Sequence, residues 1–198
     1  RKRQPLMNEP DQSYNGAIWA DAVPKLTGAN IPFAIRARVV LLRDLGAPLS
    51  PFNAFQIIQG LETVALRMKQ HCVNAEKVVS FLETQKKVTN VIYPTNHQGE
   101  IKERAKKYMQ GGYGSLVGMD VGTREAGSKF IDNLKMLYHV ANIGDARSLA
   151  IHPATTTHSQ LNDEELLAAG VTPGYVRLSI GIEHPDDIIA DIKQALAA

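Results

Sequence analysis

The sequence feature that most constrains the fold is an apolar pattern with helical spacing over residues 50–85. It opens with Ser50 and Pro51, because serine can cap the first free amides of a helix and proline suits the first helical position. Apolar side chains then recur every three or four residues, at Phe52, Phe55, Ile58, Leu61, Ala65, Met68, Cys72, Ala75, Val79 and Leu82. At a rise of about 1.5 Å per residue, the predicted helix would be roughly 50 Å long. We therefore expect it to bend or to link two bodies, and a long core helix within one domain stays the alternative.

Predicted strands and helices alternate after this helix. Segments rich in β-branched residues predict strands at residues 88–93, 115–121, 137–143 and 176–182. Periodic segments predict helices at residues 101–109, 123–136 and 163–169, the last with Asn162 as its cap, and a final helix after His184-Pro185. This order predicts an α+β domain from about residue 86, with a mainly antiparallel sheet covered by helices.

Residues 1–32 contain four prolines and show no sustained period. They predict an extended or loosely helical arm. Because Tyr14 and Trp19 are large apolar side chains, we expect the arm to pack on another surface.

The composition is typical of a globular protein and excludes several classes. Of the 198 residues 44% are hydrophobic and 21% are charged. The net charge is +2 and the acidic and basic residues are interspersed, which gives no sign of a nucleic-acid partner. Cys72 is the single cysteine, which excludes a disulfide framework and a cysteine-rich zinc site. It lies in the apolar stripe, so we interpret it as a small core residue. Without an apolar run of spanning length or a signal peptide, the sequence predicts a cytoplasmic protein without a membrane partner.

The common catalytic and nucleotide-binding motifs are absent from the sequence. There is no Walker loop, no Gly-x-Gly-x-x-Gly after a strand, no Gly-x-Ser-x-Gly and no His-Glu-x-x-His. No sequence motif therefore supports nucleotide binding, metal binding or serine-hydrolase chemistry. What remains is a polar loop at residues 142–158 between two predicted strands. Such loops often carry binding function, but the residues alone favour a simple connection whose hydroxyl groups satisfy its own backbone.

Arg177 lies inside the otherwise apolar strand predicted at residues 176–182. The strand period of two places it on one face with Ser179 and Gly181, and leaves the apolar residues on the other face. In a cleft, its planar guanidinium could bind a carboxylate through two parallel hydrogen bonds. On an open surface it would simply be solvated. Gly181 would let another backbone approach closely.

Several of these segments resemble the Cys/Met-metabolism family of pyridoxal-phosphate enzymes, in its O-acetylhomoserine sulfhydrylase branch. The resemblance rests on LGAPLSPFNAF at residues 45–55, on NIGDARSL at 142–149 with His152-Pro153-Ala154 and Thr156-Thr157-His158, and on VRLSIGIE at 176–183. It covers most of residues 8–198 in order, which makes it far more specific than one short motif.

The resemblance implies a pyridoxal 5'-phosphate enzyme that replaces the γ-acetoxy group of O-acetylhomoserine by sulfide or a thiol. It implies the fold of aspartate aminotransferase, in which residues 1–49 form an arm and the end of the large cofactor domain, 50–85 a linker helix, and 86–198 the small C-terminal domain. In the family the arginine of the last strand binds the substrate α-carboxylate, and Arg177 matches it. Ser148 matches the loop serine that lies beside the lysine-bound cofactor.

One departure limits what the resemblance implies. The family's Schiff-base lysine follows Ser-x-Thr, and no lysine here has that context; Lys129 follows Gly127-Ser128 in a helical pattern. We therefore expect this chain to supply the carboxylate clamp and to be inactive alone. Its partner would be an N-terminal cofactor domain that this sequence does not include, and the complete enzyme would be a homo-oligomer. A non-catalytic binding or subunit module derived from the same family is the alternative.

Overall fold

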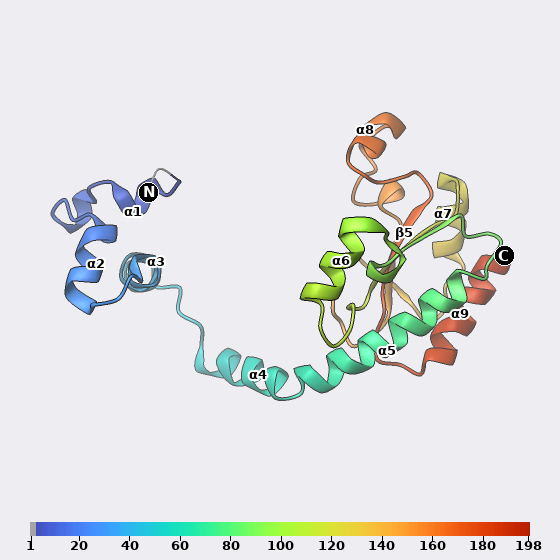
Figure 1. Cartoon of the computed structure of the whole chain (residues 1–198), viewed down its shortest axis with the longest axis horizontal. Coiled ribbons are helices and arrows are strands. Elements are labelled where there is room, and N and C mark those ends of the chain that lie inside the picture. Colours follow the sequence, from blue (N-terminus) through green and yellow to red (C-terminus); the bar gives the residue numbers. More distant parts are fainter. Residues whose placement is uncertain (1–2) are drawn as a thin grey trace. The chain divides into compact units, whose positions relative to one another are not determined.

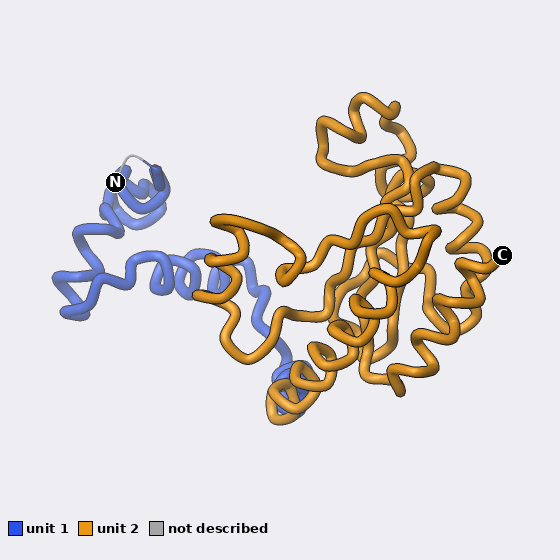
Figure 2. Tube along the Cα trace, turned by 45° about the vertical axis from the view of Figure 1, so that its right-hand side comes forward, with its two compact units in different colours: residues 1–60 blue, residues 61–198 orange. Residues whose placement is uncertain are grey.

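The computed structural model describes residues 3–198, which form two compact units (Figure 2). One unit comprises the residues up to Gly60, and the other comprises Leu61–Ala198. Each unit has its own cluster of buried apolar side chains. A separate core in each part is what a compact folding unit requires.

The N-terminal unit consists of short helices around a small apolar cluster. Its elements are α1 (Pro5–Asn8), η1 (Gln12–Tyr14), α2 (Trp19–Thr27), α3 (Pro32–Arg36), the π-helical η2 (Ala37–Asp44) and α4 (Pro51–Glu62), which runs just past the unit boundary (Figure 1). Trp19 is buried with Met7 and Val23. Its indole Nε1 donates to Asp11 Oδ2 at 2.9 Å, and its ring meets Tyr14 edge-on with centroids 4.8 Å apart. The segment predicted as a loose arm is thus largely helical, and Tyr14 and Trp19 pack within it.

The helix predicted over residues 50–85 is not continuous. Thr63, with φ −109° and ψ 1°, separates α4 from α5 (Val64–Leu82), and α5 ends before the predicted Gln85. The predicted start is confirmed, because Ser50 Oγ accepts a hydrogen bond from the Asn53 amide at 3.1 Å. The apolar stripe is buried only from Cys72 onward within α5, and Cys72 is a core residue as predicted. The α4 part is exposed at Phe52, Phe55, Ile58 and Leu61.

The C-terminal unit is an α+β domain, as predicted. Its elements are α5, β1 (Asn90–Ile92), η3 (Pro94–Asn96), α6 (Gly99–Tyr108), β2 (Leu116–Asp120), α7 (Arg124–Asp132), β3 (Tyr138–His139), β4 (Leu149–Ile151), η4 (Pro153–Thr155), α8 (Asp163–Ala168), β5 (Tyr175–Ser179) and α9 (Pro185–Ala197). The strands form one sheet in the order β1-β2-β5-β4-β3. All neighbouring pairs are antiparallel except β3 with β4, which confirms the mainly antiparallel sheet.

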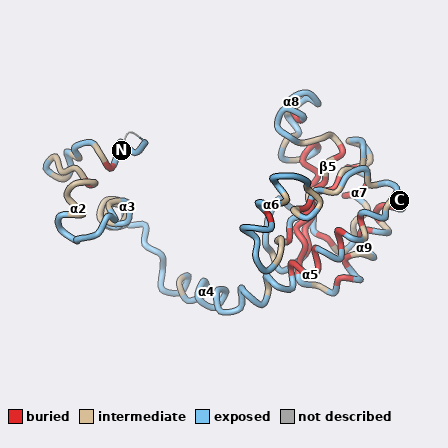
Figure 3. The backbone as a smooth tube through the Cα atoms, viewed as in Figure 1, coloured by how far each residue is buried: buried red, intermediate tan, exposed pale blue. Residues whose placement is uncertain are grey.

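The core of this unit lies on one face of the sheet. The apolar residues of β5 and its continuation, Val176, Leu178 and Ile180, are fully buried, which is the alternation expected of a half-covered strand. They join one cluster with side chains from α5, α7 and α9. Figure 3 shows buried residues along β5, α5 and α9. The other face of β5 carries Tyr175, Arg177 and Ser179.

Several predicted elements differ in extent from the structure, among them the strand predicted at 88–93, which is shortened to β1. The strand predicted at 137–143 is reduced to β3, the strand predicted at 176–182 ends at Ser179, and the helix predicted at 123–136 ends at Asp132. The strand β4 was not predicted, because it lies within the segment interpreted as a polar loop. The predicted cap of α8 is confirmed as a capping box, in which Asn162 and Glu165 each accept from the other's amide at 2.9 Å.

Candidate active site

Arg177 lies on β5, the middle strand of the sheet, with β2 on one side and β4 on the other. Its side chain is partly buried, and its Nη2 donates to the carbonyl oxygen of Asn142 at 3.2 Å. Its Nε is buried and has no hydrogen-bond partner among residues 3–198. A buried donor without an acceptor is destabilising by about 1–3 kcal/mol. The guanidinium therefore has unused capacity to bind an anion.

Tyr175 is the neighbour of Arg177 on the same face of β5. Burial raises the pKa of the Tyr175 phenol, and the nearby Arg177 charge partly opposes that rise. The ring lies over Gly118, the residue of β2 directly opposite Arg177. A Cβ added at Gly118 would come within 2.7 Å of the ring, so glycine is needed there to leave room for the tyrosine.

The loop at residues 142–148 runs beside β5 and is bonded to it at successive points. Beyond the bond from Arg177 to Asn142, the Gly144 amide donates to Ser179 Oγ at 3.2 Å. Further on, the Ile182 amide donates to the Ala146 carbonyl at 2.8 Å. The polar loop and the arginine strand, which are separate in sequence, therefore form one local structure.

Ser148 is fully buried at the far end of this loop. Its Oγ accepts from the Gly181 amide at 2.8 Å and donates to Glu183 Oε2 at 2.9 Å, while its amide donates to Glu183 Oε1 at 2.6 Å. The close approach predicted at Gly181 is present, since a Cβ there would collide with the Ala146 carbonyl and with Glu183. Ser148 is thus bonded to Gly181, which lies four residues after Arg177 and past the end of β5. No hydrogen bond joins the Ser148 and Arg177 side chains in the part of the chain that the structure describes.

Two polar side chains of α5 support the same strand end from the core side. His71 Nδ1 lies 2.6 Å from the Ile180 carbonyl, and Asn74 Nδ2 donates to the carbonyls of Gly181 at 3.0 Å and Glu183 at 2.8 Å. Because a carbonyl only accepts, Nδ1 of His71 carries the proton. The sequence interpretation did not single out His71, Asn74 or Glu183. His71 and Asn74 could have been found, because they are polar residues next to Cys72 and Ala75 of the apolar stripe.

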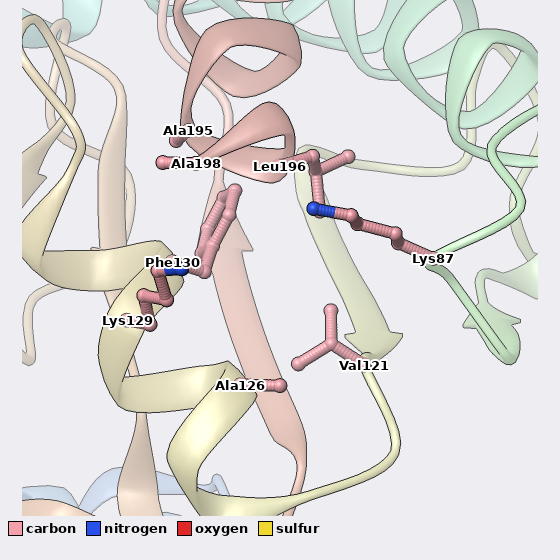
Figure 4. A pocket seen from close by; sticks show the side chains of 8 residues that line it. All are labelled: Lys87, Val121, Ala126, Lys129, Phe130, Ala195, Leu196 and Ala198. Atoms are coloured by element: carbon pink, nitrogen blue, oxygen red, sulfur yellow. The ribbon is translucent and has the colours of Figure 1, made fainter.

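Lys129 lies elsewhere in the unit, exposed on α7 at the edge of a hollow of about 260 Å³ (Figure 4). The hollow is lined by Lys87, Val121, Ala126, Lys129, Phe130, Ala195, Leu196 and Ala198. None of them belongs to the 142–148 loop or to β5. Arg177 does not line the hollow beside Lys129.

Residues 3–198 contain no cluster of three or more histidine, cysteine, aspartate or glutamate side chains arranged to bind a metal ion. None of the helices formed by these residues combines the length and apolarity that crossing a bilayer requires.

The sequence pattern of the Cys/Met metabolism PLP-dependent enzymes matches residues 15–197. The chain belongs to this family. The resemblance seen in the 45–55, 142–149 and 176–183 segments is thereby confirmed.

Relatives within the Cys/Met metabolism family include sulfhydrylases. An O-acetyl-L-homoserine sulfhydrylase of Leptospira meyeri is 50% identical over 193 residues, covering 95% of this chain and 44% of that enzyme. An O-acetyl-L-homoserine sulfhydrylase of Thermus thermophilus is 43% identical, covering 98% of this chain and 45% of that enzyme. The chain spans somewhat less than half the length of these curated relatives.

Solved structures of the family confirm the fold. An O-acetylhomoserine (thiol)-lyase of Campylobacter jejuni, which carries a pyridoxyl-lysine monophosphate, aligns with a TM-score of 0.84 and 42% identity over 100% of this chain and 46% of its own. An O-acetylhomoserine sulfhydrylase of Wolinella succinogenes aligns with a TM-score of 0.75 and 30% identity over 89% of this chain and 47% of its own.

The residues of this chain fit the substrate end of a PLP site. The buried Nε of Arg177 lacks an acceptor, and a carboxylate would supply one. No lysine of the sequence follows Ser-x-Thr, and Lys129 lies on α7 away from the arginine. The donors of Arg177 therefore suit a carboxylate, and no lysine has the sequence context expected for covalent attachment of the cofactor.

Proposed function

We propose that the complete protein is a PLP-dependent O-acetylhomoserine sulfhydrylase, which replaces the γ-acetoxy group of O-acetylhomoserine by sulfide or a thiol. Relatives bearing that name at 43–50% identity support the reaction class. The observation that carries the role of this chain is the buried, unpartnered Nε of Arg177 on the polar face of the middle strand. The chain supplies the clamp for the substrate α-carboxylate.

The geometry of Arg177 determines how this clamp works. Nε and Nη2 form one edge of the guanidinium, and two parallel donors on one edge match the two oxygens of a carboxylate. The carboxylate takes the place of the Asn142 carbonyl on Nη2 and satisfies Nε at the same time. Because the strand is bonded on both sides, the bound carboxylate has a fixed position from which the rest of the substrate extends.

Bound pyridoxal phosphate supplies the electron sink that the carbon chemistry needs. The residues of this chain orient the substrate relative to it. Arg177 fixes the α-carboxylate, and Ser148, on the loop that runs beside the arginine, helps to shape the same pocket.

The proposal extends to the context in which this chain acts. The cofactor-binding residues belong to a further part of the complete enzyme, so this chain by itself is inactive. The complete enzyme is a cytoplasmic homo-oligomer that acts in methionine and cysteine metabolism. The alignments with 46% and 47% of two solved relatives support only the first of these points, that the complete enzyme has a further part.

Substitution of Arg177 in the full-length protein tests the function. Arg177→Ala should lower kcat/KM for O-acetylhomoserine roughly 100- to 10,000-fold, because it removes two charged hydrogen bonds of about 1.5–3 kcal/mol each, and Arg177→Lys should lose less. Cofactor absorbance and the thermal midpoint should stay near wild type. Arg104→Ala, which removes a surface ion pair with Glu100 on α6, is the matched control. Unchanged kinetics in Arg177→Ala would show a merely solvated arginine, and a wild-type enzyme without sulfhydrylase activity would refute the function itself.

A further inference from the structure

The carboxylate of Glu183 accepts hydrogen bonds from both donors of Ser148. Its two carboxylate oxygens accept from the Ser148 amide at 2.6 Å and from the Ser148 hydroxyl at 2.9 Å. Its own carbonyl oxygen accepts from Asn74 of α5 at 2.8 Å. Glu183 thus connects the end of the 142–148 loop to the core helix below the sheet.

The carboxylate also determines what the Ser148 hydroxyl can do. A serine hydroxyl has one proton to donate and two lone pairs that accept. The proton is directed to Glu183, and one lone pair accepts from the Gly181 amide. An ionised carboxylate accepts only, so the hydroxyl cannot reverse its direction. Ser148 is left with acceptor capacity alone.

The same contact sets the position of the loop beside the arginine. The loop is bonded to Arg177 at Asn142 and to Ser179 at Gly144, each at 3.2 Å. Those two bonds are long for their type, whereas the two bonds to Glu183 are shorter and charge-assisted. The firmest attachment of the loop therefore lies at its Ser148 end, where the Ile182 amide also donates to the Ala146 carbonyl at 2.8 Å.

We propose that Glu183 is a positioning residue of the substrate site, which orients the Ser148 hydroxyl as an acceptor and holds the 142–148 loop in place beside Arg177. The proposal rests on the sulfhydrylase function proposed above. Glu183 acts through Ser148 and the loop, without touching the substrate itself.

Glu183→Gln tests this role in the full-length protein with its cofactor bound. A glutamine has one accepting oxygen and one donating NH₂ group, so it cannot accept from both the amide and the hydroxyl of Ser148. If its NH₂ group faces the Ser148 amide, two N–H groups oppose each other. If its NH₂ group faces the hydroxyl, the hydroxyl must accept and turn its proton elsewhere. We expect KM for O-acetylhomoserine to rise at least about tenfold, with a smaller change in kcat and an unchanged cofactor spectrum. Glu164→Gln removes an exposed carboxylate of α8 and should leave KM unchanged.

Ser148→Ala provides the second arm of the test. In that background the glutamine oxygen can accept from the residue 148 amide and its NH₂ meets no donor. The effect of Glu183→Gln on KM should therefore shrink to a few-fold or less. An equal effect of Glu183→Gln in both backgrounds would overturn the proposal, and so would wild-type KM in the single variant.

Amide hydrogen exchange gives a readout that needs no turnover. In Glu183→Gln the Ser148 and Gly181 amides should exchange at least about tenfold faster than in wild type, while the Leu178 amide in β5 should be unaffected. Faster exchange at all three amides would indicate general destabilisation and contradict a positioning role. If the wild type turns over no O-acetylhomoserine, the proposed function fails, and the exchange comparison still decides whether Glu183 holds the loop.

Discussion

Asp191 on α9 is a buried carboxylate that holds the segment between α7 and β3. Its oxygens accept from the amides of Lys135, Met136 and Leu137 at 2.9, 2.9 and 3.0 Å, and from Gln194 at 3.0 Å. Burial alone would raise the pKa of Asp191, but the three amides and Gln194 outweigh it and leave the pKa below its ordinary value.

We predict that Asp191→Ala lowers the free energy of unfolding by at least about 2 kcal/mol, because it leaves buried amides without acceptors. Since the folded pKa is depressed, the stabilisation by the carboxylate is complete above its unfolded pKa of about 4 and is lost as the pH falls through the folded value. The stability difference between wild type and Asp191→Asn should therefore shrink below about pH 4.

Urea denaturation followed by circular dichroism over a pH series measures this difference. Asp187→Asn, which removes an exposed carboxylate from the first turn of the same helix, is the control and should cost only a few tenths of a kcal/mol. A difference between wild type and Asp191→Asn that is independent of pH would contradict the assignment.

Part of the site is predictable from single residues. The period of two correctly separates Arg177 from Val176, Leu178 and Ile180, which are fully buried. It fails at Ile182, which is 37% exposed, because the strand has ended and the chain turns toward α9. The partnership of Ser148 with Glu183 spans 35 residues of sequence, and no local pattern encodes such a contact.

At the level of elements, the capping box of α8 is the local structure that the sequence specifies most directly. Asn162 caps the Glu165 amide and Glu165 caps the Asn162 amide, both at 2.9 Å. We predict that Asn162→Ala lowers the stability of the domain by about 1 kcal/mol. Asn162→Asp, which keeps a capping oxygen, should cost much less. Thermal unfolding of the three proteins measures the effect, and equal midpoints for Ala and Asp would contradict it.

Two elements show where sequence patterns reach their limit. Between α4 and α5 the apolar spacing continues unbroken, so periodicity cannot reveal that Thr63 leaves the helix. The weak helix formers Gly60 and Thr63 near the break are compatible with it but do not require it. The strand β4 has only three residues. It forms because β5 supplies an antiparallel partner from a distant part of the chain, and a pattern of three residues is too short to predict a strand.

At the level of the whole molecule, the C-terminal unit contains its complete core. Every buried side chain of its main cluster lies between Ala75 and Leu196. We therefore predict that residues 61–198, expressed alone, unfold cooperatively with a thermal midpoint close to that of the same unit in the whole chain. Near-ultraviolet circular dichroism and calorimetry measure this. A gradual transition with loss of the tyrosine signal at low temperature would show that the unit depends on other residues.

The middle position of β5 has a consequence for motion at the site. A strand paired on both sides exchanges its amide hydrogens only when the whole domain opens, whereas a connecting loop opens locally and far more often. Arg177 should therefore keep its place for as long as the domain stays folded, because its strand opens only with the domain. In the proposed clamp, the position of a bound carboxylate would thus follow from the strand, which is the most persistently placed part of the site.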